Sequence, residues 1–221
     1  MNLKRRLPQY LIGLIVMASG VVFIKKAEIG ISPLSAIPVA LSNLTPFTLG
    51  NMTILFHTFC MLMTFMVQRR VSLKAVLLLP LAILFGYIID LLMFIYAMPE
   101  LSLVIRFIVS FGGIILSGFG IVLIAGADLM LPAPDALLRT ISARAGKSLS
   151  IIKTVGDITW VAATVLIELV FAGKIISIGI GTVLSMILTG KLVGVFGKLL
   201  PKLKMEPTDV WLQRRSKKRQ R

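Results

Sequence analysis

The sequence predicts an all-α fold, a polytopic membrane helix bundle with six transmembrane helices. They form two inverted three-helix repeats, with short half-helices after spans one and four. Three observations lead to this prediction. First, 57% of the 221 residues are hydrophobic, whereas soluble domains are usually about 45–50% apolar. Second, apolar runs of about 18 or more residues, long enough to cross a bilayer, recur six times. Third, the two halves of the chain resemble each other.

The six predicted spans follow one another with short connections, and their approximate bounds are 7–24, 47–67, 75–98, 103–125, 151–171 and 175–197. The first span could pass for a secretory signal peptide, but Lys25 and Lys26 follow it in place of a small-residue cleavage site. We therefore interpret it as a retained helix. The spans leave no stretch for a soluble domain, so we expect a membrane domain over residues 1–200 and a basic cytoplasmic tail over residues 201–221.

The net charge of +15 indicates membrane orientation and not nucleic-acid binding, because the basic residues lie in short segments between the spans. Cytoplasmic segments of membrane proteins carry an excess of Lys and Arg. With the N-terminus inside, the inner segments carry most of these residues: Lys4, Arg5, Arg6, Arg69, Arg70, Lys74, Arg139, Arg144, Lys147 and those of the tail. The outer segments carry only Lys25, Lys26 and Lys174. Both termini are therefore predicted to be cytoplasmic.

The remaining composition limits the partners and the chemistry. The basic tail is expected to lie on anionic lipids of the inner leaflet, where each basic residue contributes roughly 1 kcal/mol. The single cysteine, Cys60, excludes an intrachain disulfide and a cysteine-rich metal site. No paired nucleophile and base, metal-ligand spacing or phosphate-binding loop is present in the sequence. We therefore expect no enzymatic activity, cofactor or metal. Whether the protein forms a homodimer is not decided by the sequence.

The two halves of the chain correspond at an offset of roughly 100 residues. Ala27-Glu28-Ile29 matches Ala127-Asp128-Leu129, and the segment that starts at Pro33 matches the one that starts at Pro134. Because each half has an odd number of spans, the second half must sit upside down, as in many secondary transporters. Each Pro-led segment is predicted to form a short helix with proline in its first turn. The two are either half-helices that dip toward the membrane centre or amphipathic connectors at its surface.

The fifth span has the most informative pattern, because its polar residues fall on one helical face. They are spaced by four, three, four and four residues: Lys153, Asp157, Trp160, Thr164 and Glu168. A charge that faces lipid costs about 3 kcal/mol on insertion scales. We therefore expect this stripe to face protein or a wet cavity, as the wall of a polar pathway. Lys153 and Asp157 are expected to form an ion pair.

Other ionisable residues are candidates for the same pathway. Asp90, late in the third span, is the isolated carboxylate that desolvation would favour as a proton binder, and Arg106 is expected to neutralise it. Asp135 lies in the first turn of the second Pro-led segment. Lys191 in the sixth span either partners Asp157 or extends to the inner surface.

Several residues receive structural interpretations. Glu168 and Lys174 are expected to be solvated near the outer surface, and the lone histidine, His57, to be packed and hydrogen-bonded. The small residues of the sixth span fall on one face: Gly181, Ser185 and Thr189. Small residues allow close approach of helix backbones, so we expect this face to pack against another span, most plainly the fifth.

Four short motifs occur in order along the chain: Gly20 with Gly30-Ile31-Ser32-Pro33, Pro134-Asp135, Lys153-x-x-x-Asp157, and Gly179-Ile180-Gly181-Thr182. Together they resemble the YczE/YyaS/YitT-type bacterial integral membrane proteins over about residues 7–197. The chain departs from that pattern at Pro134-Asp135, where an intervening Arg is missing, and at Asp157, where Glu is commoner. The resemblance implies a bacterial cytoplasmic membrane and no settled biochemical activity.

The sequence favours a small secondary transporter or permease for an unidentified small solute. The candidate pathway residues are Asp90, Arg106, Asp135, Lys153, Asp157 and Lys191. The alternative is a non-transporting membrane scaffold or helper protein that acts through a partner, with the basic tail as the contact surface.

Overall fold

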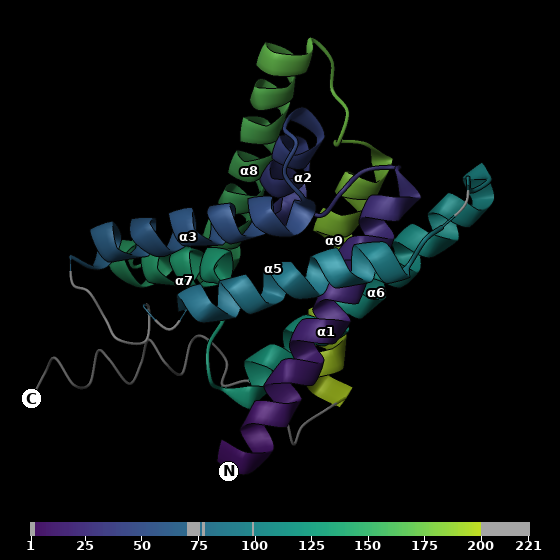
Figure 1. Ribbon diagram of the computed structural model, residues 1–221. Helices are drawn as coiled ribbons and strands as arrows, with labels where there is room; N and C mark the ends of the chain where they lie inside the picture. Colours follow the sequence, from purple (N-terminus) through teal and green to yellow (C-terminus); the bar gives the residue numbers. More distant parts are fainter. Residues whose placement is uncertain (1–2, 70–75, 77, 99, 200–221) are drawn as a thin grey trace, which may run out of the picture.

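The computed structural model describes residues 3–69, 76, 78–98 and 100–199 (Figure 1). These residues form helices without strands. The helices are α1 (Leu3–Ala27), α2 (Pro33–Leu44), α3 (Leu49–Gln68), α5 (Leu78–Ile95), α6 (Leu103–Ala127), α7 (Ala133–Ala145), α8 (Leu149–Ala172) and α9 (Ile180–Leu199). Six of them, all except α2 and α7, are long and apolar enough to cross a membrane. The predicted polytopic helix bundle is confirmed, whereas the predicted tail at 201–221 lies outside the described residues.

Local capping chemistry sets the ends of the long helices. Thr48 Oγ1 accepts a hydrogen bond from the backbone N of Asn51 at 3.1 Å, and Ser148 Oγ accepts one from the backbone N of Ile151 at 3.4 Å. Each hydroxyl thereby satisfies a free N–H in the first turn of α3 or α8. Gly173 ends α8 with a φ of +67°, a conformation that glycine adopts without a steric penalty.

The helices α1 and α6 pack along each other at the centre of the bundle, and glycines bring their backbones together. A Cβ at Gly20 would lie 2.5 Å from the backbone N of Ser117 and 2.6 Å from the carbonyl O of Gly113. A Cβ at Gly120 would lie 2.6 Å from the backbone N of Met17. Small residues at helix interfaces allow this approach in membranes. The main apolar core surrounds this pair, with α5 against α1 and α9 against α6.

The two Pro-led segments form short helices, as expected, and both pack against spans of the bundle. Pro33 is the first residue of α2, and Pro134 lies in the first turn of α7. Each short helix packs against both α3 and α8. Ala36 and Ala40 of α2 have no exposed surface. The helix α2 is therefore buried between spans, which favours the half-helix interpretation over a connector on the surface.

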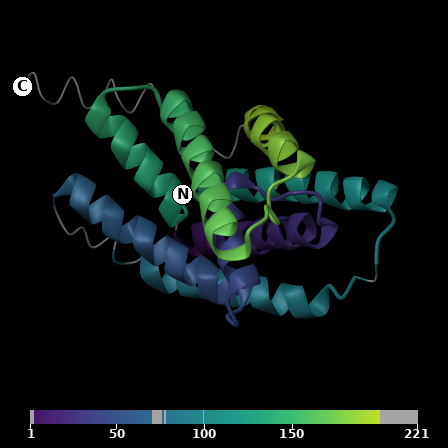
Figure 2. The ribbon, with the colours of Figure 1, turned by 90° about the horizontal axis from the view of Figure 1, so that it is seen from above.

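The expected partner of the sixth span was wrong. Its helix, α9, begins at Ile180 and packs mainly on α6, whereas α8 and α9 diverge (Figure 2). The small residues at its start accommodate the segment between α1 and α2 instead. The backbone N of Gly181 donates to Ile29 O at 2.8 Å, and the backbone N of Ile31 donates to Thr182 Oγ1 at 2.9 Å. These two hydrogen bonds hold the segment between α1 and α2 against the start of α9. A side chain larger than glycine at position 181 would occupy the space in which that segment lies.

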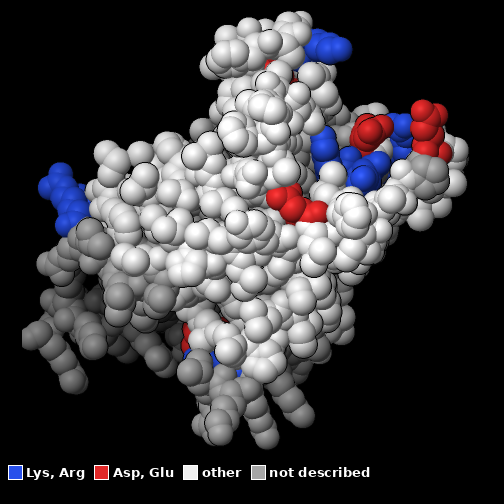
Figure 3. Space-filling view, viewed as in Figure 1, with Lys and Arg blue, Asp and Glu red and all other residues white. Residues whose placement is uncertain are grey.

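The outer surface of the bundle is largely apolar. In the view of Figure 3, uncharged residues form most of the surface, and Lys, Arg, Asp and Glu gather chiefly at its margins. Many large apolar side chains of α3, α5, α6 and α8 are exposed, including Phe94, Val104 and Phe171. A soluble protein rarely exposes so large an apolar area. Hydrocarbon is the solvent that suits this surface, in agreement with six membrane spans.

Candidate functional site

A cluster of charged and aromatic side chains lies where α3, α7 and α8 meet. The first turn of α7 holds Asp135 at the positive end of its helix dipole. Lys153 Nζ of α8 donates to Asp135 Oδ1 at 3.3 Å. The two side chains are 33% and 17% exposed, so the ion pair is mostly withdrawn from the surface. A half-helix and a membrane span are therefore joined by one ion pair.

The next turns of α8 place two further polar groups beside this pair. Asp157 Oδ1 and Trp160 Nε1 are buried, and neither has a hydrogen-bond partner among the described residues. The ring of Phe56 on α3 meets the Trp160 indole edge to face, with centroids 5.2 Å apart. Buried polar atoms in proteins are nearly always hydrogen-bonded. One free acceptor and one free donor thus lie within one turn of the same helix.

The polar stripe of α8 faces protein, as predicted. Thr164 and Glu168 are completely buried, and the three stripe residues before them are half-buried. The apolar residues on the other face are each more than half exposed: Val155, Ile158, Leu166 and Val170. The helix therefore turns its charges toward the bundle, which avoids the cost of exposing them to hydrocarbon.

The ion pair within the stripe differs from the expected one. Lys153 pairs with Asp135 of α7, not with Asp157 one turn along its own helix. The short helix α7 packs on α8 and brings Asp135 within reach, and the sequence of α8 alone gives no sign of this. Of the two alternatives for Lys191, the pairing with Asp157 is not formed among the described residues. Lys191 is exposed on α9, which lies mainly against α6.

Asp90 has a capping role, so its predicted role as an isolated proton binder is not supported. Asp90 Oδ1 accepts from the backbone N of Gly50 at 2.7 Å, and Asp90 Oδ2 accepts from Thr48 Oγ1 at 2.6 Å. The carboxylate of α5 therefore caps the start of α3, where a helix dipole favours negative charge. Arg106 does not neutralise it. Arg106 Nη1 lies 3.0 Å from Glu28 Oε2, and Arg106 Nε donates to Leu101 O.

The expectation that Glu168 is solvated was wrong. The side chain has no exposed surface, and its carboxylate accepts hydrogen bonds from two backbone N–H groups. Ile176 N lies 2.8 Å from Oε2, and Ser177 N lies 3.0 Å from Oε1. The segment between α8 and α9 folds back over the end of α8 and leaves these groups without helical partners. Glu168 supplies the acceptors that this turn needs.

A chain of polar contacts extends from Glu168 to α1. Asn43 Nδ2 at the end of α2 donates to Ser177 Oγ at 3.2 Å, and Lys25 Nζ donates to Asn43 Oδ1 at 2.7 Å. Each contact joins a different element: the α8–α9 segment, α2 and α1. This network therefore holds α2 and α8 together at one end of the bundle, and the ion pair of Lys153 with Asp135 lies farther along α8, toward its start.

Two ion pairs cross between α1 and α6, and sequence reasoning missed both. Arg6 Nη1 lies 3.4 Å from Asp128 Oδ2, and Arg106 Nη1 lies 3.0 Å from Glu28 Oε2. Each arginine is near the start of one helix, and each acid directly follows the end of the other. Glu28 and Asp128 both adopt positive φ, +54° and +51°. The offset of 100 residues between the arginines, and between the acids, was the available signal.

The lone histidine and the lone cysteine are buried on α3. His57 is buried and stacks on Phe85 with ring centroids 5.7 Å apart, which agrees with the expected packing, whereas its ring makes no hydrogen bond to the residues that the structure describes. Cys60 has no exposed surface. Among the described residues, no group of three His, Cys, Asp or Glu side chains could hold a metal ion.

Six apolar spans and a charged cluster turned inward define a polytopic membrane protein. The chain belongs to a family of unknown function (DUF6198), whose model matches residues 4–198. No curated protein and no solved structure matched in the comparisons. The family match gives no link to the YczE/YyaS/YitT-type proteins, so that resemblance stays a prediction.

Proposed function

We propose that this protein is a small secondary transporter whose solute site is the α3–α7–α8 cluster. The single observation that carries the proposal is that two buried polar atoms, Asp157 Oδ1 and Trp160 Nε1, have no hydrogen-bond partner in the part of the chain that the structure describes, beside the ion pair of Asp135 and Lys153. Charged groups inside a membrane are costly and typically mark solute or ion pathways. Of the six pathway candidates in the sequence, three belong to this site.

The correspondence between the two halves of the chain supports an inverted repeat, and with it the same proposal. At an offset of 100 residues, the two halves have matching ion-pair residues, matching caps at Thr48 and Ser148, and matching interface glycines at Gly20 and Gly120. Corresponding helices also make corresponding contacts, since α2 packs on α8 as α7 packs on α3. In transporters with inverted repeats, the solute site lies near the membrane centre at broken helices. The start of α7 suits this description.

In the proposed mechanism, α7 and α8 move together relative to α3 and open the cluster to one side of the membrane at a time. The glycine-packed pair α1 and α6 is the fixed support for this motion. The solute replaces the missing partners of Asp157 and Trp160, and Asp157 takes up or releases a proton as the solute leaves or enters. Lys153 remains with Asp135 and keeps the charge of the site balanced.

We further propose that both termini face the cytoplasm of a bacterial cell, because the basic residues favour this orientation. Lys147 precedes α8 on the cytoplasmic side, and Lys174 follows it on the outside. In a Cys60→Ala background, cysteine at position 174 should react with an impermeant maleimide added to whole cells. Cysteine at position 147 should react only after the membrane is opened. The reverse labelling would overturn the orientation.

The transport proposal is tested with purified protein in sealed vesicles, with an imposed pH gradient and a panel of labelled small solutes. We expect at least one solute to accumulate in response to the gradient. Asp157→Asn should lower its initial uptake rate at least tenfold, since the proton-binding group is lost. Asp128→Asn is the matched control, because Asp128 is a surface carboxylate, 79% exposed. Solute uptake by this variant should stay near the wild-type rate.

Two results would contradict the proposal. One is uptake by Asp157→Asn at the wild-type rate. The other is a folded protein that moves no member of a broad panel, which would favour the alternative function of a membrane scaffold or helper.

A further inference from the structure

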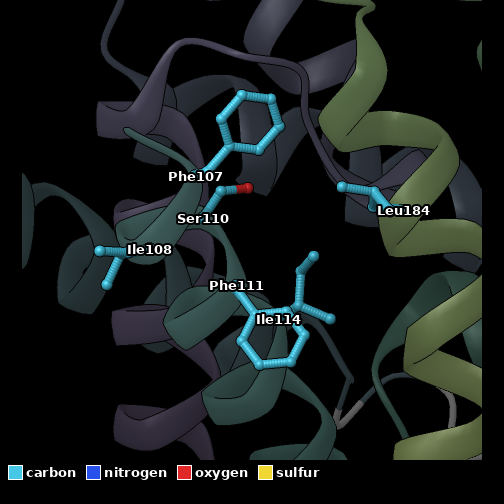
Figure 4. A pocket seen from close by; sticks show the side chains of 6 residues that line it. All are labelled: Phe107, Ile108, Ser110, Phe111, Ile114 and Leu184. Atoms are coloured by element: carbon cyan, nitrogen blue, oxygen red, sulfur yellow. The ribbon is translucent and has the colours of Figure 1, made fainter. Parts of the chain in front are cut away.

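A groove between α6 and α9 is separate from the proposed solute site. Its cavity of about 340 Å³ is lined by Phe107, Ile108, Ser110, Phe111, Ile114 and Leu184 (Figure 4). All of these side chains except Ser110 are apolar. Phe107, Ile108 and Phe111 are also exposed on the outside of the bundle, so the groove opens toward the surrounding hydrocarbon.

One polar side chain, that of Ser110, is among the described residues that line the groove. Ser110 is 1% exposed, and its hydroxyl has no hydrogen-bond partner among the described residues. Figure 4 shows the hydroxyl directed into the space between α6 and α9, toward Leu184. A buried hydroxyl without a partner is destabilising, typically by about 1–3 kcal/mol. A ligand with a hydrogen-bond acceptor at this point would satisfy the hydroxyl.

Water does not fit this description. A buried water molecule usually needs two to four polar partners, and the groove offers the single hydroxyl of Ser110 among apolar walls. An empty groove would leave its apolar walls without contacts on one side. The chemistry that matches is an apolar chain with a single acceptor near one end.

The charge of Arg106 favours a phospholipid as the ligand that carries this apolar chain. Arg106 precedes Ser110 by one helical turn, about 6 Å along the axis, and lies in the first turn of α6. Its side chain is 30% exposed although it pairs with Glu28. An arginine is well suited to bind a phosphate. Arg106, the Ser110 hydroxyl and the apolar groove thus follow one another along α6. A phospholipid carries the matching groups in the same order: a phosphate, an ester carbonyl and an acyl chain.

We propose that the groove between α6 and α9 binds one phospholipid molecule of the surrounding leaflet. Ser110 donates its hydroxyl proton to an ester carbonyl oxygen, Arg106 contacts the phosphate, and the acyl chain lies against Phe111, Ile114 and Leu184. The bound acyl chain fills the space between α9 and α6, so it contributes to the packing of α9 against α6.

The test compares two phosphatidylglycerols with the same chains, one joined by ester and one by ether bonds. The full-length protein is purified in detergent, stripped of lipid and titrated with each lipid, and binding is read by native mass spectrometry. The ether lipid has no carbonyl acceptor, so the wild-type protein should bind the ester lipid about fivefold more tightly. Ser110→Ala should bind both equally. Arg106→Gln should weaken both but leave a fatty-acid methyl ester unchanged.

A variant that blocks the groove provides a second binding experiment, which does not depend on Ser110. Leu184→Trp places a large ring in the groove and should reduce binding of the ester lipid at least tenfold. Val183→Trp, on the exposed face of the same helix, is the matched control and should bind normally. Circular dichroism establishes that both variants are folded. Equal binding of ester and ether lipids by the wild-type protein, or undiminished binding by a folded Leu184→Trp variant, would overturn the proposal.

Discussion

Replacement of Lys153 by methionine is expected to lower the stability of the protein by about 1–3 kcal/mol. Removal of one member of a buried ion pair leaves the other charge without compensation, which costs about 3–5 kcal/mol when burial is complete. The partial exposure of Lys153 and Asp135 lowers this figure. The thermal midpoint of the purified protein in detergent measures the effect.

A second substitution identifies the partner of Lys153. Asp135→Asn added to Lys153→Met removes the stranded carboxylate, so it should restore most of the lost thermal stability. Asp157→Asn added to the same background should restore less, because Asp157 is not the hydrogen-bonded partner of Lys153. Better rescue by Asp157→Asn would show that the pair within α8, expected from sequence spacing, is the correct one.

Replacement of Glu168 by alanine is expected to cost about 2–5 kcal/mol. The backbone N–H groups of Ile176 and Ser177 would lose their acceptors, and each unsatisfied buried donor costs about 1–3 kcal/mol. A cavity would also form, because Glu168 is fully buried. Thermal melting in detergent checks the size of the effect, and limited proteolysis between α8 and α9 checks its location.

Glu168→Gln separates the acceptor role from the charge. Glutamine keeps one carbonyl oxygen at nearly the same place, so it should lose clearly less stability than alanine. Glu28→Ala, a change at a carboxylate that is 66% exposed, should have a small effect. Equal melting temperatures for the wild type and Glu168→Ala would exclude the proposed capping of the α8–α9 segment.

The spans and the direction of the polar face of α8 were predictable from the sequence, because each depends on patterns within one helix. Apolar runs set the spans, and the spacing from Lys153 to Glu168 set the face. The start of α7 was predictable too, since Pro134 suits a first turn. These are local features, and the structure agrees with them.

The partners of the charged residues were not predictable in the same way. Asp135 reaches Lys153 only because α7 packs on α8, and Asp90 reaches Gly50 only because α5 packs on α3. Burial of Glu168 depends on the fold of the segment that follows α8. Position along a span gives depth in the membrane, and depth alone does not say which neighbouring helix supplies a partner.

The charged stripe of α8 faces the interior of the bundle, and the candidate site depends on this arrangement. Spin labels placed one at a time along residues 151–171 in lipid vesicles, read by electron paramagnetic resonance for collision with oxygen, test it most directly. We expect low oxygen accessibility at positions 153, 157 and 164, and high accessibility at 155, 158 and 166, with a helical period. High accessibility at 153, 157 and 164 would place those residues in lipid and contradict both the site and the proposed transport.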